Sequence, residues 1–283
     1  MVGALPEKVR AALRDSTLAQ KVYRRLVVPL SRQSEPDLYL VRGCTFDTAV
    51  DVGANVGTYS IELAKVSRHV VAFEPVRVAY HVLKHVVPYN VKCYEFALGE
   101  SNESGTISIP NHEGRLESAL ASISPSDQPG GAVQDVEIRS FDAGWSQFRP
   151  QADACIDFVK IDVEGYELSS LKGMMKTVEK FLPVLLIEIE IRHNRSFSEV
   201  FVLLDSLGYR SYYSPDGISL VPCCSQDLQQ LQTKERLDSN RQQQPKGYSR
   251  GEKRRYINNF WFVHTRSRAA SHLDSLTRAR EKC

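Results

Sequence analysis

Short apolar runs alternate with stretches of helical periodicity over most of this chain, and this alternation is the feature that most restricts its fold. The pattern is typical of a parallel sheet with helices on both faces. The run 184–187 is apolar at every position, as expected for a strand buried on both sides. We therefore predict an α/β, doubly wound, mostly parallel seven-stranded sheet. The predicted strands are 49–52, 70–73, 91–98, 156–161, 184–191, 209–213 and 259–263, and the predicted helices are 58–66, 78–87, 168–178 and 198–207.

Between the third and fourth predicted strands the pattern changes: apolar and polar residues alternate with period two in SGTISIP and AVQDVEIRS. This spacing predicts an inserted β-hairpin around a long polar loop. The chain has 283 residues, enough for one domain of roughly 200–250 residues with appendages. We expect an N-terminal helical extension at 1–39, a domain at 40–264 with a polar, mobile insertion at 222–256, and a basic tail at 265–283.

The net charge of +2 hides an uneven distribution. Residues 1–30 carry 6 Lys/Arg and 2 Asp/Glu, residues 31–240 carry 19 and 29, and residues 241–283 carry 11 and 3. An acidic body argues against a domain whose main surface binds nucleic acid, while the basic C-terminal segment leaves contact with a polyanion open.

The sequence has no signal-peptide pattern and no membrane span. Its 6 cysteines show no CxxC and no zinc-ligand spacing, so we expect free thiols in a reducing compartment. A cytoplasmic protein is the prediction.

The segment 50–58, VDVGANVGT, follows the first predicted strand and opens a helix. Parallel sheets bind nucleotide-like ligands at this position. A dinucleotide fingerprint needs glycine at positions 53, 55 and 58, but Asn55 and Thr58 occupy two of them, and no Walker A lysine follows. Glu74 closes the second strand, where an acidic residue binds ribose hydroxyls. The pattern favours a nucleoside without phosphates, such as S-adenosylmethionine, over NAD or NADP; the alternative is a simple turn.

Five ordered segments resemble the FkbM-type S-adenosylmethionine-dependent methyltransferases, and the resemblance covers roughly residues 40–264. They are VDVGANVGTYS (50–60), FEP (73–75), FALGE with SGTISI (96–109), DFVKIDVEGYELSSLKGM (157–174) and VLLIEIE (184–190). The resemblance implies a class I methyltransferase (Rossmann-like) fold with S-adenosyl-L-methionine as methyl donor. Segment 222–256 and the residues after His264 do not match, so the acceptor stays open.

The resemblance also implies where the donor binds. The methionine part would lie against the glycine loop, the ribose at the end of the second strand, the adenine beyond the third, and the methyl group at the ends of the fourth and fifth strands. The implied cofactor-binding residues are Asp51, Gly53, Ala54, Asn55, Gly57, Thr58, Glu74, Pro75, Phe96, Ala97 and Asp162.

Two carboxylates at strand ends, Asp162 and Glu188, are the predicted catalytic residues, because an alcohol acceptor needs a base as it is methylated. The alternative for Asp162 is an ion pair with Lys160, which strand alternation places on the same side. Glu164 has an equal claim to a role in turning the backbone or capping a helix, and His193 is a weaker base candidate. Asp162, Glu164 and Glu188 have no spacing that supports a metal, and we predict none.

The sequence thus predicts an O-methyltransferase acting on a hydroxyl of a sugar, glycoconjugate or secondary metabolite. The alternatives are a non-catalytic S-adenosylmethionine-binding module of the same fold and a methyltransferase acting on protein or nucleic acid. We expect Trp145 and Trp261 to be core residues rather than sugar platforms. Four polar residues of the inserted loop are acceptor contacts or merely solvated: Asn111, His112, Ser118 and Ser122.

Overall fold

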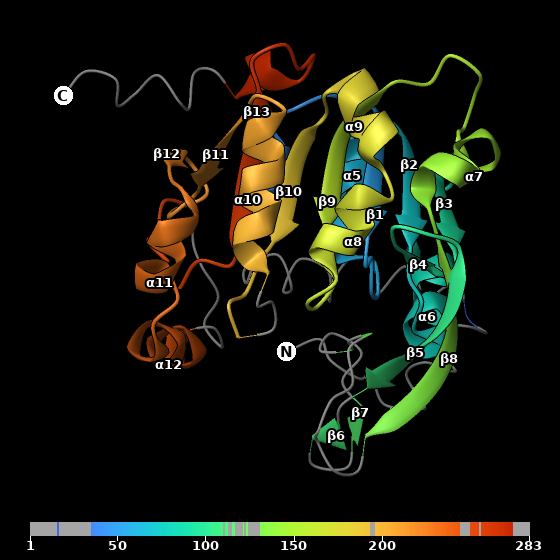
Figure 1. The fold of residues 1–283 in the computed structure, drawn as a ribbon, viewed down its shortest axis with the longest axis horizontal. Helices are drawn as coiled ribbons and strands as arrows, with labels where there is room; N and C mark the ends of the chain where they lie inside the picture. Colours follow the sequence, from blue (N-terminus) through green and yellow to red (C-terminus); the bar gives the residue numbers. More distant parts are fainter. Residues whose placement is uncertain are drawn as a thin grey trace.

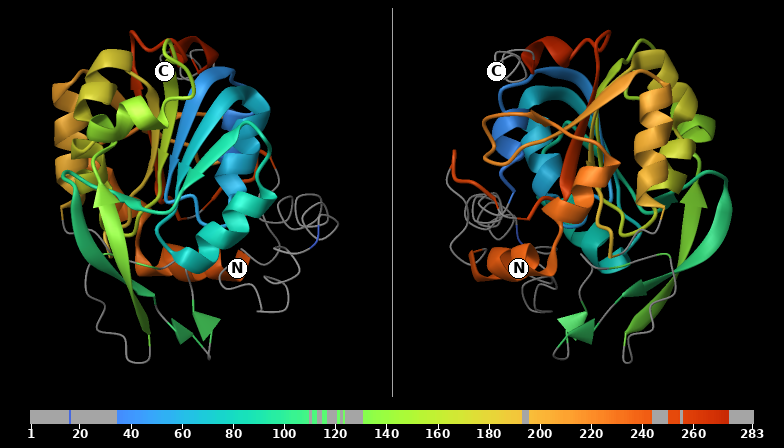
Figure 2. Two further views of the ribbon diagram at one scale, coloured as in Figure 1. Left: turned by 90° about the vertical axis from the view of Figure 1, so that its right-hand side faces the viewer. Right: turned by 60° about the vertical axis from the view of Figure 1, so that its left-hand side comes forward.

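A computed structural model describes residues 16, 35–109, 111–112, 115–116, 121, 123, 131–192, 196–243, 250–254 and 256–273. Most of the predicted N-terminal extension lies outside these residues. The described residues form an α/β domain in which helices cover both faces of a central sheet (Figure 1), and the two further views show its three layers (Figure 2).

The central sheet has the strand order β3-β2-β1-β9-β10-β13-β11-β12. The pairs from β3 to β10 are parallel, whereas β13 lies antiparallel between β10 and β11. The doubly wound, mostly parallel sheet is therefore confirmed. Its strands are β1 (Phe46–Val52), β2 (Ser67–Phe73), β3 (Val91–Tyr94), β9 (Ile156–Ile161), β10 (Val184–Glu188), β11 (Tyr209–Tyr213), β12 (Val221–Pro222) and β13 (Asn259–His264).

The strand count differs from the prediction because β12 adds an eighth strand at the edge. It is two residues long, too short to carry a periodic pattern, and its Pro222 suits an edge position because proline lacks a backbone donor. The single strand predicted at 91–98 is also wrong. The chain leaves the central sheet after Tyr94, and Ala97–Leu98 (β4) pairs in a second sheet.

Helices pack on the two faces through alternate residues of the strands. Val50 and Val52 of β1 belong to the core on one side, and Ala49 belongs to the core on the other. The helices on the first side are α7 (Phe141–Phe148), α8 (Glu167–Lys172), α9 (Met175–Phe181) and α10 (Phe197–Ser206). The helices on the other side are α4 (Leu38–Val41) and α5 (Thr58–Val66). Helix α6 (Arg77–Val86) belongs to a third cluster, together with residues of the sheet that contains β4.

The helix predicted at 168–178 is two helices, α8 and α9, separated at Gly173. A side chain at Gly173 would place its Cβ 1.8 Å from the carbonyl oxygen of Gly99. Only glycine permits this close backbone approach, which local periodicity does not reveal.

The predicted hairpin insertion is confirmed. β5 (Glu103–Ile109) pairs antiparallel with β8 (Ala132–Arg139), and β4 completes the three-stranded sheet. At its tip, β6 (Asn111–His112) pairs with β7 (Arg115–Leu116). The arm extends past the central sheet, at the lower right of Figure 1. Ser118 and Ser122 lie outside the described residues.

Segment 222–256 contains the helical turn Ser225–Asp227 (η3) and the helices α11 (Leu228–Leu231) and α12 (Lys234–Gln243). The side chain of Gln232 attaches it to the end of β10: it accepts a hydrogen bond from Ile191 N (2.9 Å) and donates to the carbonyl oxygen of Ile189 (2.6 Å). After β13 the chain forms a short turn, Ala270–His272 (η5).

Within the described ranges, no helix is both long and apolar enough to cross a membrane. The cysteines in these ranges are free thiols, as predicted: Cys44, Cys93, Cys155, Cys223 and Cys224.

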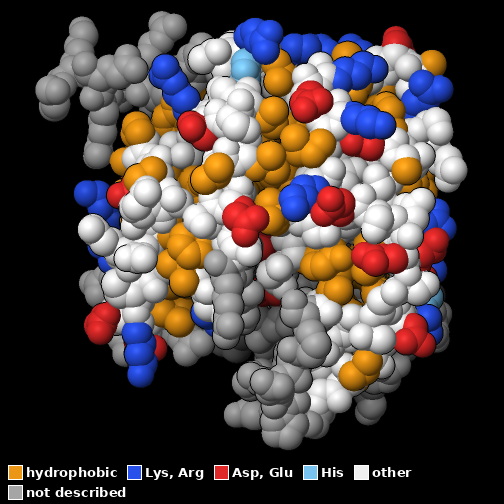
Figure 3. Space-filling view, viewed as in Figure 1, with side chains coloured by type: hydrophobic (Ala, Val, Ile, Leu, Met, Phe, Trp, Pro, Cys, Tyr) orange, Lys and Arg blue, Asp and Glu red, His pale blue; other side chains and the backbone are white. Residues whose placement is uncertain are grey.

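Basic side chains gather at the edge of the sheet where the parallel strands begin. Arg68 lies at the start of β2, and Arg266 and Arg268 follow the end of the antiparallel β13, so all three lie at this edge. In the space-filling view Lys and Arg side chains line the upper rim of the molecule (Figure 3). The carboxyl ends of the parallel strands lie at the opposite edge, where the predicted site residues are found.

Candidate active site

The loop between β1 and α5 has three residues in the left-handed region: Gly53 (φ 79°), Asn55 (φ 47°) and Gly57 (φ 95°). Asparagine is one of the few side chains that tolerate this conformation. At Gly53 a Cβ would lie 1.9 Å from the carbonyl oxygen of Asp162, so only glycine lets the loop approach the end of β9. The amides of Gly53 and Ala54 both donate to the carbonyl oxygen of Phe73 at 3.0 Å.

Two buried carboxylates hold this loop. Asp51, the residue before the end of β1, accepts a hydrogen bond from the Ser60 hydroxyl at 2.5 Å, which secures the first turn of α5. Glu74 accepts backbone hydrogen bonds from Asn55 N and Val76 N, both at 2.7 Å, so it joins the glycine loop to the chain that follows β2. Burial raises the pKa of Asp51 to about 6 and the pKa of Glu74 to about 8.

The residues predicted for the adenine lie beside this loop, but the Phe96 side chain belongs to the core. Its ring lies 5.3 Å from the ring of Phe73 and 5.5 Å from that of Phe148, and the Arg139 guanidinium covers it at 4.6 Å. Ala97 is buried at the start of β4. The Pro75 carbonyl accepts a hydrogen bond from the Gln134 side chain at 2.8 Å, which fixes the chain after Glu74. Thr58 is the first residue of α5.

Lys160 lies fully buried at the centre of the predicted catalytic edge. Its ammonium donates to Asn259 Oδ1 at 2.7 Å, and lies 3.4 Å from Asp162 Oδ2 and 3.9 Å from Glu188 Oε2. It also lies 5.0 Å from the centre of the Tyr59 ring. Burial is the largest single effect and opposes its charge, but the surrounding carboxylates, chiefly Asp162 and Glu188 with Glu35 and Asp37, together hold the pKa of Lys160 above its ordinary value. The side chain of Asp162 keeps 33% exposure, so the ion pair leaves it open to a ligand.

Glu188 ends β10 beside Asp162, as predicted. Asn258 Nδ2 donates to its Oε1 at 2.6 Å. Burial, reinforced by the charge of Asp162, raises the pKa of Glu188 well above its ordinary value. An acid of this kind is suited to proton transfer near neutral pH.

Glu167 fixes the turn that follows Glu164. Gly165 N donates to Glu167 Oε1 at 2.8 Å, and this buried carboxylate begins α8. Glu164 lies near Glu190 and Arg192, and burial raises its pKa to about 8. His193 lies outside the described residues. Among the described residues, no group of three or more His, Cys, Asp or Glu side chains could hold a metal ion.

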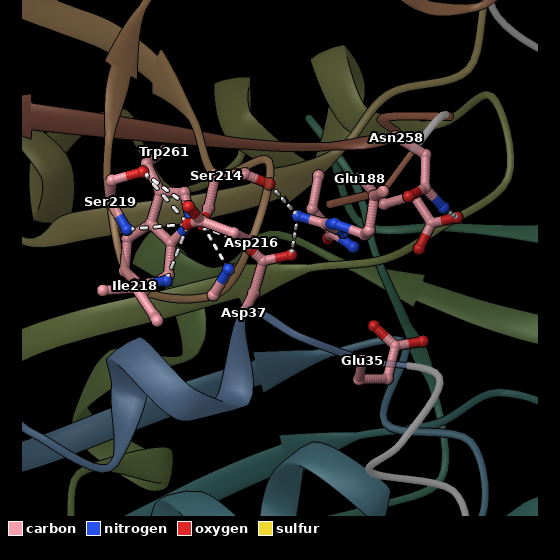
Figure 4. A network of polar contacts seen from close by, with 12 residues as sticks. Glu35, Asp37, Glu188, Ser214, Asp216, Ile218, Ser219, Asn258 and Trp261 are labelled. Atoms are coloured by element: carbon pink, nitrogen blue, oxygen red, sulfur yellow. Dashed lines mark hydrogen bonds and ion pairs between the residues drawn. The ribbon is translucent and has the colours of Figure 1, made fainter. Parts of the chain in front are cut away.

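The sequence missed the residues that reach this edge from the segment before β1. Asp37 is fully buried; Trp261 Nε1 donates to its Oδ1 at 2.7 Å, and Arg254 Nη2 lies 2.8 Å from its Oδ2 (Figure 4). Glu35 accepts a hydrogen bond from the Tyr59 hydroxyl at 3.2 Å. The segment carries no motif; the only signal was an indole that needs an acceptor when buried. Trp261 is a core residue, as predicted, and Trp145 is half-buried and packs against the core.

The edge therefore carries more acidic than basic groups. Figure 3, which looks onto one face of the molecule, shows acidic side chains beside a hollow near the centre of that face. Such a balance favours a ligand with a positive charge. The carboxylates are Glu35, Asp37, Asp51, Asp162 and Glu188, and the cations among them are Lys160 and Arg254.

Residues 51–211 match the model of the methyltransferase FkbM domain, which covers more than half of the chain. The chain belongs to the FkbM methyltransferase family. This confirms the family expected from the motifs and, together with the strand order, the class I methyltransferase fold.

The individual proteins that resemble this FkbM methyltransferase share a low sequence identity with it. It is 27% identical over 213 residues to the methyltransferase sdnD of Sordaria araneosa, covering 63% of this chain and 81% of that protein. A crystal structure of methyltransferase FkbM from Methylobacillus flagellatus KT matches 90% of this chain with a TM-score of 0.43 and 16% identity, and this chain spans 58% of that one. The plantazolicin methyltransferase BpumL, solved with SAH, matches 91% of this chain and 94% of its own, with a TM-score of 0.38 and 10% identity.

Family membership also confirms the expected cofactor, S-adenosylmethionine, which when bound supplies an electrophilic methyl group on a positively charged sulfur. The residues present fit this molecule. Glu74 is buried and accepts two backbone hydrogen bonds, but these do not prevent burial from raising its pKa to about 8. Further donors, such as ribose hydroxyls, would stabilise its charged form. The acidic edge fits the sulfonium charge.

Proposed function

We propose that this FkbM methyltransferase transfers the methyl group of S-adenosylmethionine to a hydroxyl of a sugar, a glycoconjugate or another secondary metabolite. One observation carries the proposal: Asp162 directly follows β9, Glu188 ends the adjacent β10, and the two carboxylates lie 3.4 and 3.9 Å from one buried ammonium, that of Lys160. Two carboxylates held in this way at the edge that carries the glycine loop provide both a negative environment and a base for an alcohol acceptor.

The donor side of the proposal uses the loop and the strand ends beside it. The left-handed turns at Gly53, Asn55 and Gly57 expose backbone to the methionine part, which Asp51, Ala54 and Thr58 would also border. Ribose hydroxyls would donate to Glu74 next to Pro75, and the adenine would lie along the backbone at 96–97.

On the acceptor side, the two carboxylates have different tasks. The acceptor oxygen bonds to the methyl carbon as the carbon–sulfur bond breaks, and the hydroxyl proton must leave. Glu188 is suited to receive this proton, because burial and the charge of Asp162 raise its pKa. Asp162 lies closer to Lys160, so we assign it to the electrostatic environment of the methyl group.

Calorimetry with S-adenosylmethionine and its demethylated product tests the donor, and transfer of a radiolabelled methyl group to a panel of sugars, glycosides and phenols tests the acceptor. Glu188→Gln and Asp162→Asn should bind the demethylated product within about threefold of wild type and lose about 10²–10⁴-fold in transfer rate. Glu100→Gln, on the exposed surface, is the control. No donor binding at millimolar concentration would refute the proposal.

Methylation of protein or nucleic acid guided by the basic residues is less well supported. Arg266 and Arg268 follow the end of β13, at the edge opposite Asp162 and Glu188. A non-catalytic binding module of the same fold would bind the donor without transfer, and the two substitutions would then change nothing. Cytoplasmic localisation stays a prediction, supported by the free thiols of the described cysteines.

A further inference from the structure

Glu35 lies before β1, outside the segment that matches the family model. Its position depends on the next turn of chain, where Asp37 is anchored to Trp261 and Arg254. Because Trp261 belongs to β13 and Asp37 is fully buried, this anchor fixes the segment against the sheet. In Figure 4 the carboxylate of Glu35 points toward the side on which Glu188 and Asn258 lie.

Glu35 is also connected to the group around Lys160. Its Oε2 accepts the Tyr59 hydroxyl at 3.2 Å, and the ring of the same tyrosine lies over the Lys160 ammonium, with 5.0 Å between the nitrogen and the ring centre. The ion pairs of Lys160 are with Asp162 and Glu188. Glu35 therefore reaches the same region through a neutral hydroxyl, whereas Asp162 and Glu188 pair with the ammonium directly.

Electrostatic effects connect Glu35 and Glu188 with each other and with Asp162. Burial raises the pKa of Glu35 to about 7; Lys160 opposes this, and the charge of Asp162 adds to it. The charges of Asp162 and Glu35 in turn raise the pKa of Glu188. Side chains that influence one another in this way share one region, and a cation among them would stabilise all three as carboxylates.

We propose that Glu35 is a third carboxylate facing the methyl group to be transferred, together with Asp162 and Glu188, and that it contacts the positive end of the donor. The inference rests on the proposed function, because that proposal puts the methyl group at the ends of β9 and β10. It adds a residue of the segment before β1 to a site otherwise built from the sheet and the glycine loop.

A pair of ligands tests this without knowledge of the acceptor. Sinefungin carries a primary amine where the donor carries its sulfonium methyl, whereas S-adenosylhomocysteine is neutral there. We expect calorimetry of the full chain to show that Glu35→Gln lowers the affinity for sinefungin at least tenfold and leaves the affinity for S-adenosylhomocysteine within twofold, since a charge-assisted contact to an ammonium is lost. Glu35→Asp, which shortens the side chain, should lower the same affinity by a smaller factor.

Glu100→Gln is the matched control, because it removes an exposed carboxylate paired with Lys172 at 3.7 Å and should change neither affinity. An equal loss for both ligands in Glu35→Gln, or no loss for either, would overturn the inference, since it would assign Glu35 a purely structural role or none. If wild type binds S-adenosylhomocysteine, such a result leaves the proposed function intact. If wild type binds neither ligand, the proposed function fails, and the inference with it.

Discussion

Glu74 has a structural task besides the ligand contact that its position predicted. Both of its oxygens accept backbone hydrogen bonds, one from Asn55 in the glycine loop and one from Val76, and the residue is 4% exposed. The carboxylate therefore shapes the loop before any ligand binds. Its burial makes the charged form costly. The free energy of unfolding should therefore depend on pH through this residue, and that dependence can be measured.

The folded protein should lose stability as pH rises from about 5 to about 8 because of Glu74. Its pKa is raised from 4.5 to about 8, so the folded state keeps a proton that the unfolded state has released. The resulting stabilisation is complete below pH 4.5 and is lost as pH rises through the folded pKa, at up to about 1 kcal/mol per pH unit. Urea denaturation at pH 6, 7, 8 and 9 measures this dependence.

In Glu74→Gln this dependence on pH should be weaker than in wild type, and Glu100→Gln should retain the full dependence. Glu35 and Glu164 have pKa values raised into the same range, to about 7 and about 8, so part of the slope will persist. Equal slopes for wild type and Glu74→Gln would show that Glu74 is ionised throughout.

At the scale of elements, three segments far apart in the chain meet beside the site. The segment before β1 contributes Asp37, β13 contributes Trp261, and the chain after α12 contributes Arg254, which also donates to the carbonyl oxygen of Ser214 (Figure 4). The side chains of Arg254 and Asp37 are 4% and 0% exposed. An ion pair buried this completely holds the segments in one arrangement as long as both partners are present.

Arg254→Met should lower the free energy of unfolding by about 3–5 kcal/mol, because it leaves the Asp37 carboxylate buried without its cation. The double variant Asp37→Asn with Arg254→Met should be more stable than Arg254→Met alone, since the uncompensated charge is removed and the amide oxygen still accepts from Trp261. A double-mutant cycle by urea denaturation measures the coupling. Additive effects of the two changes would contradict the ion pair.

At the scale of the whole molecule, carboxylates predominate at one edge of the sheet, and exposed arginines lie at the other, where Asp47 and Asp157 pair with two of them. The carboxylates of the site surround Lys160 at the carboxyl ends of the parallel strands, while Arg68, Arg266 and Arg268 lie where those strands begin. Arg68, Arg266 and Arg268 are exposed, so contact of these three side chains with a polyanion is expected on the side away from the donor.

A heparin fragment should therefore bind without competing with the donor. We expect its affinity to fall at least tenfold between 50 and 200 mM salt, as for any contact made by several Lys or Arg side chains. The affinity for S-adenosylhomocysteine should change less than twofold when heparin is saturating. Fluorescence anisotropy of a labelled heparin fragment measures the first affinity, and calorimetry measures the affinity for S-adenosylhomocysteine. A flat salt dependence, or competition between the ligands, would contradict this separation of charge.

The sequence by itself determined the features whose signals are local. Alternating apolar runs predicted the sheet and its helices, and the order of motifs predicted the family. Asp51, Glu74, Asp162 and Glu188 were recognisable because each lies at or next to the end of a strand, and the carboxyl ends of parallel strands meet at one edge. Strand periodicity likewise put Lys160 on the side of Asp162.

The tertiary structure decided what depends on contacts between distant segments. Asp37 meets a tryptophan 224 residues away, and no local spacing reveals such a pair. The ring of Phe96 turned into the core because neighbouring aromatic side chains bury it there. The need for glycine at position 53 comes from the carbonyl oxygen of Asp162, on another strand. Periodicity records which face of an element is apolar, whereas packing alone selects the residues that meet across the edge of the sheet.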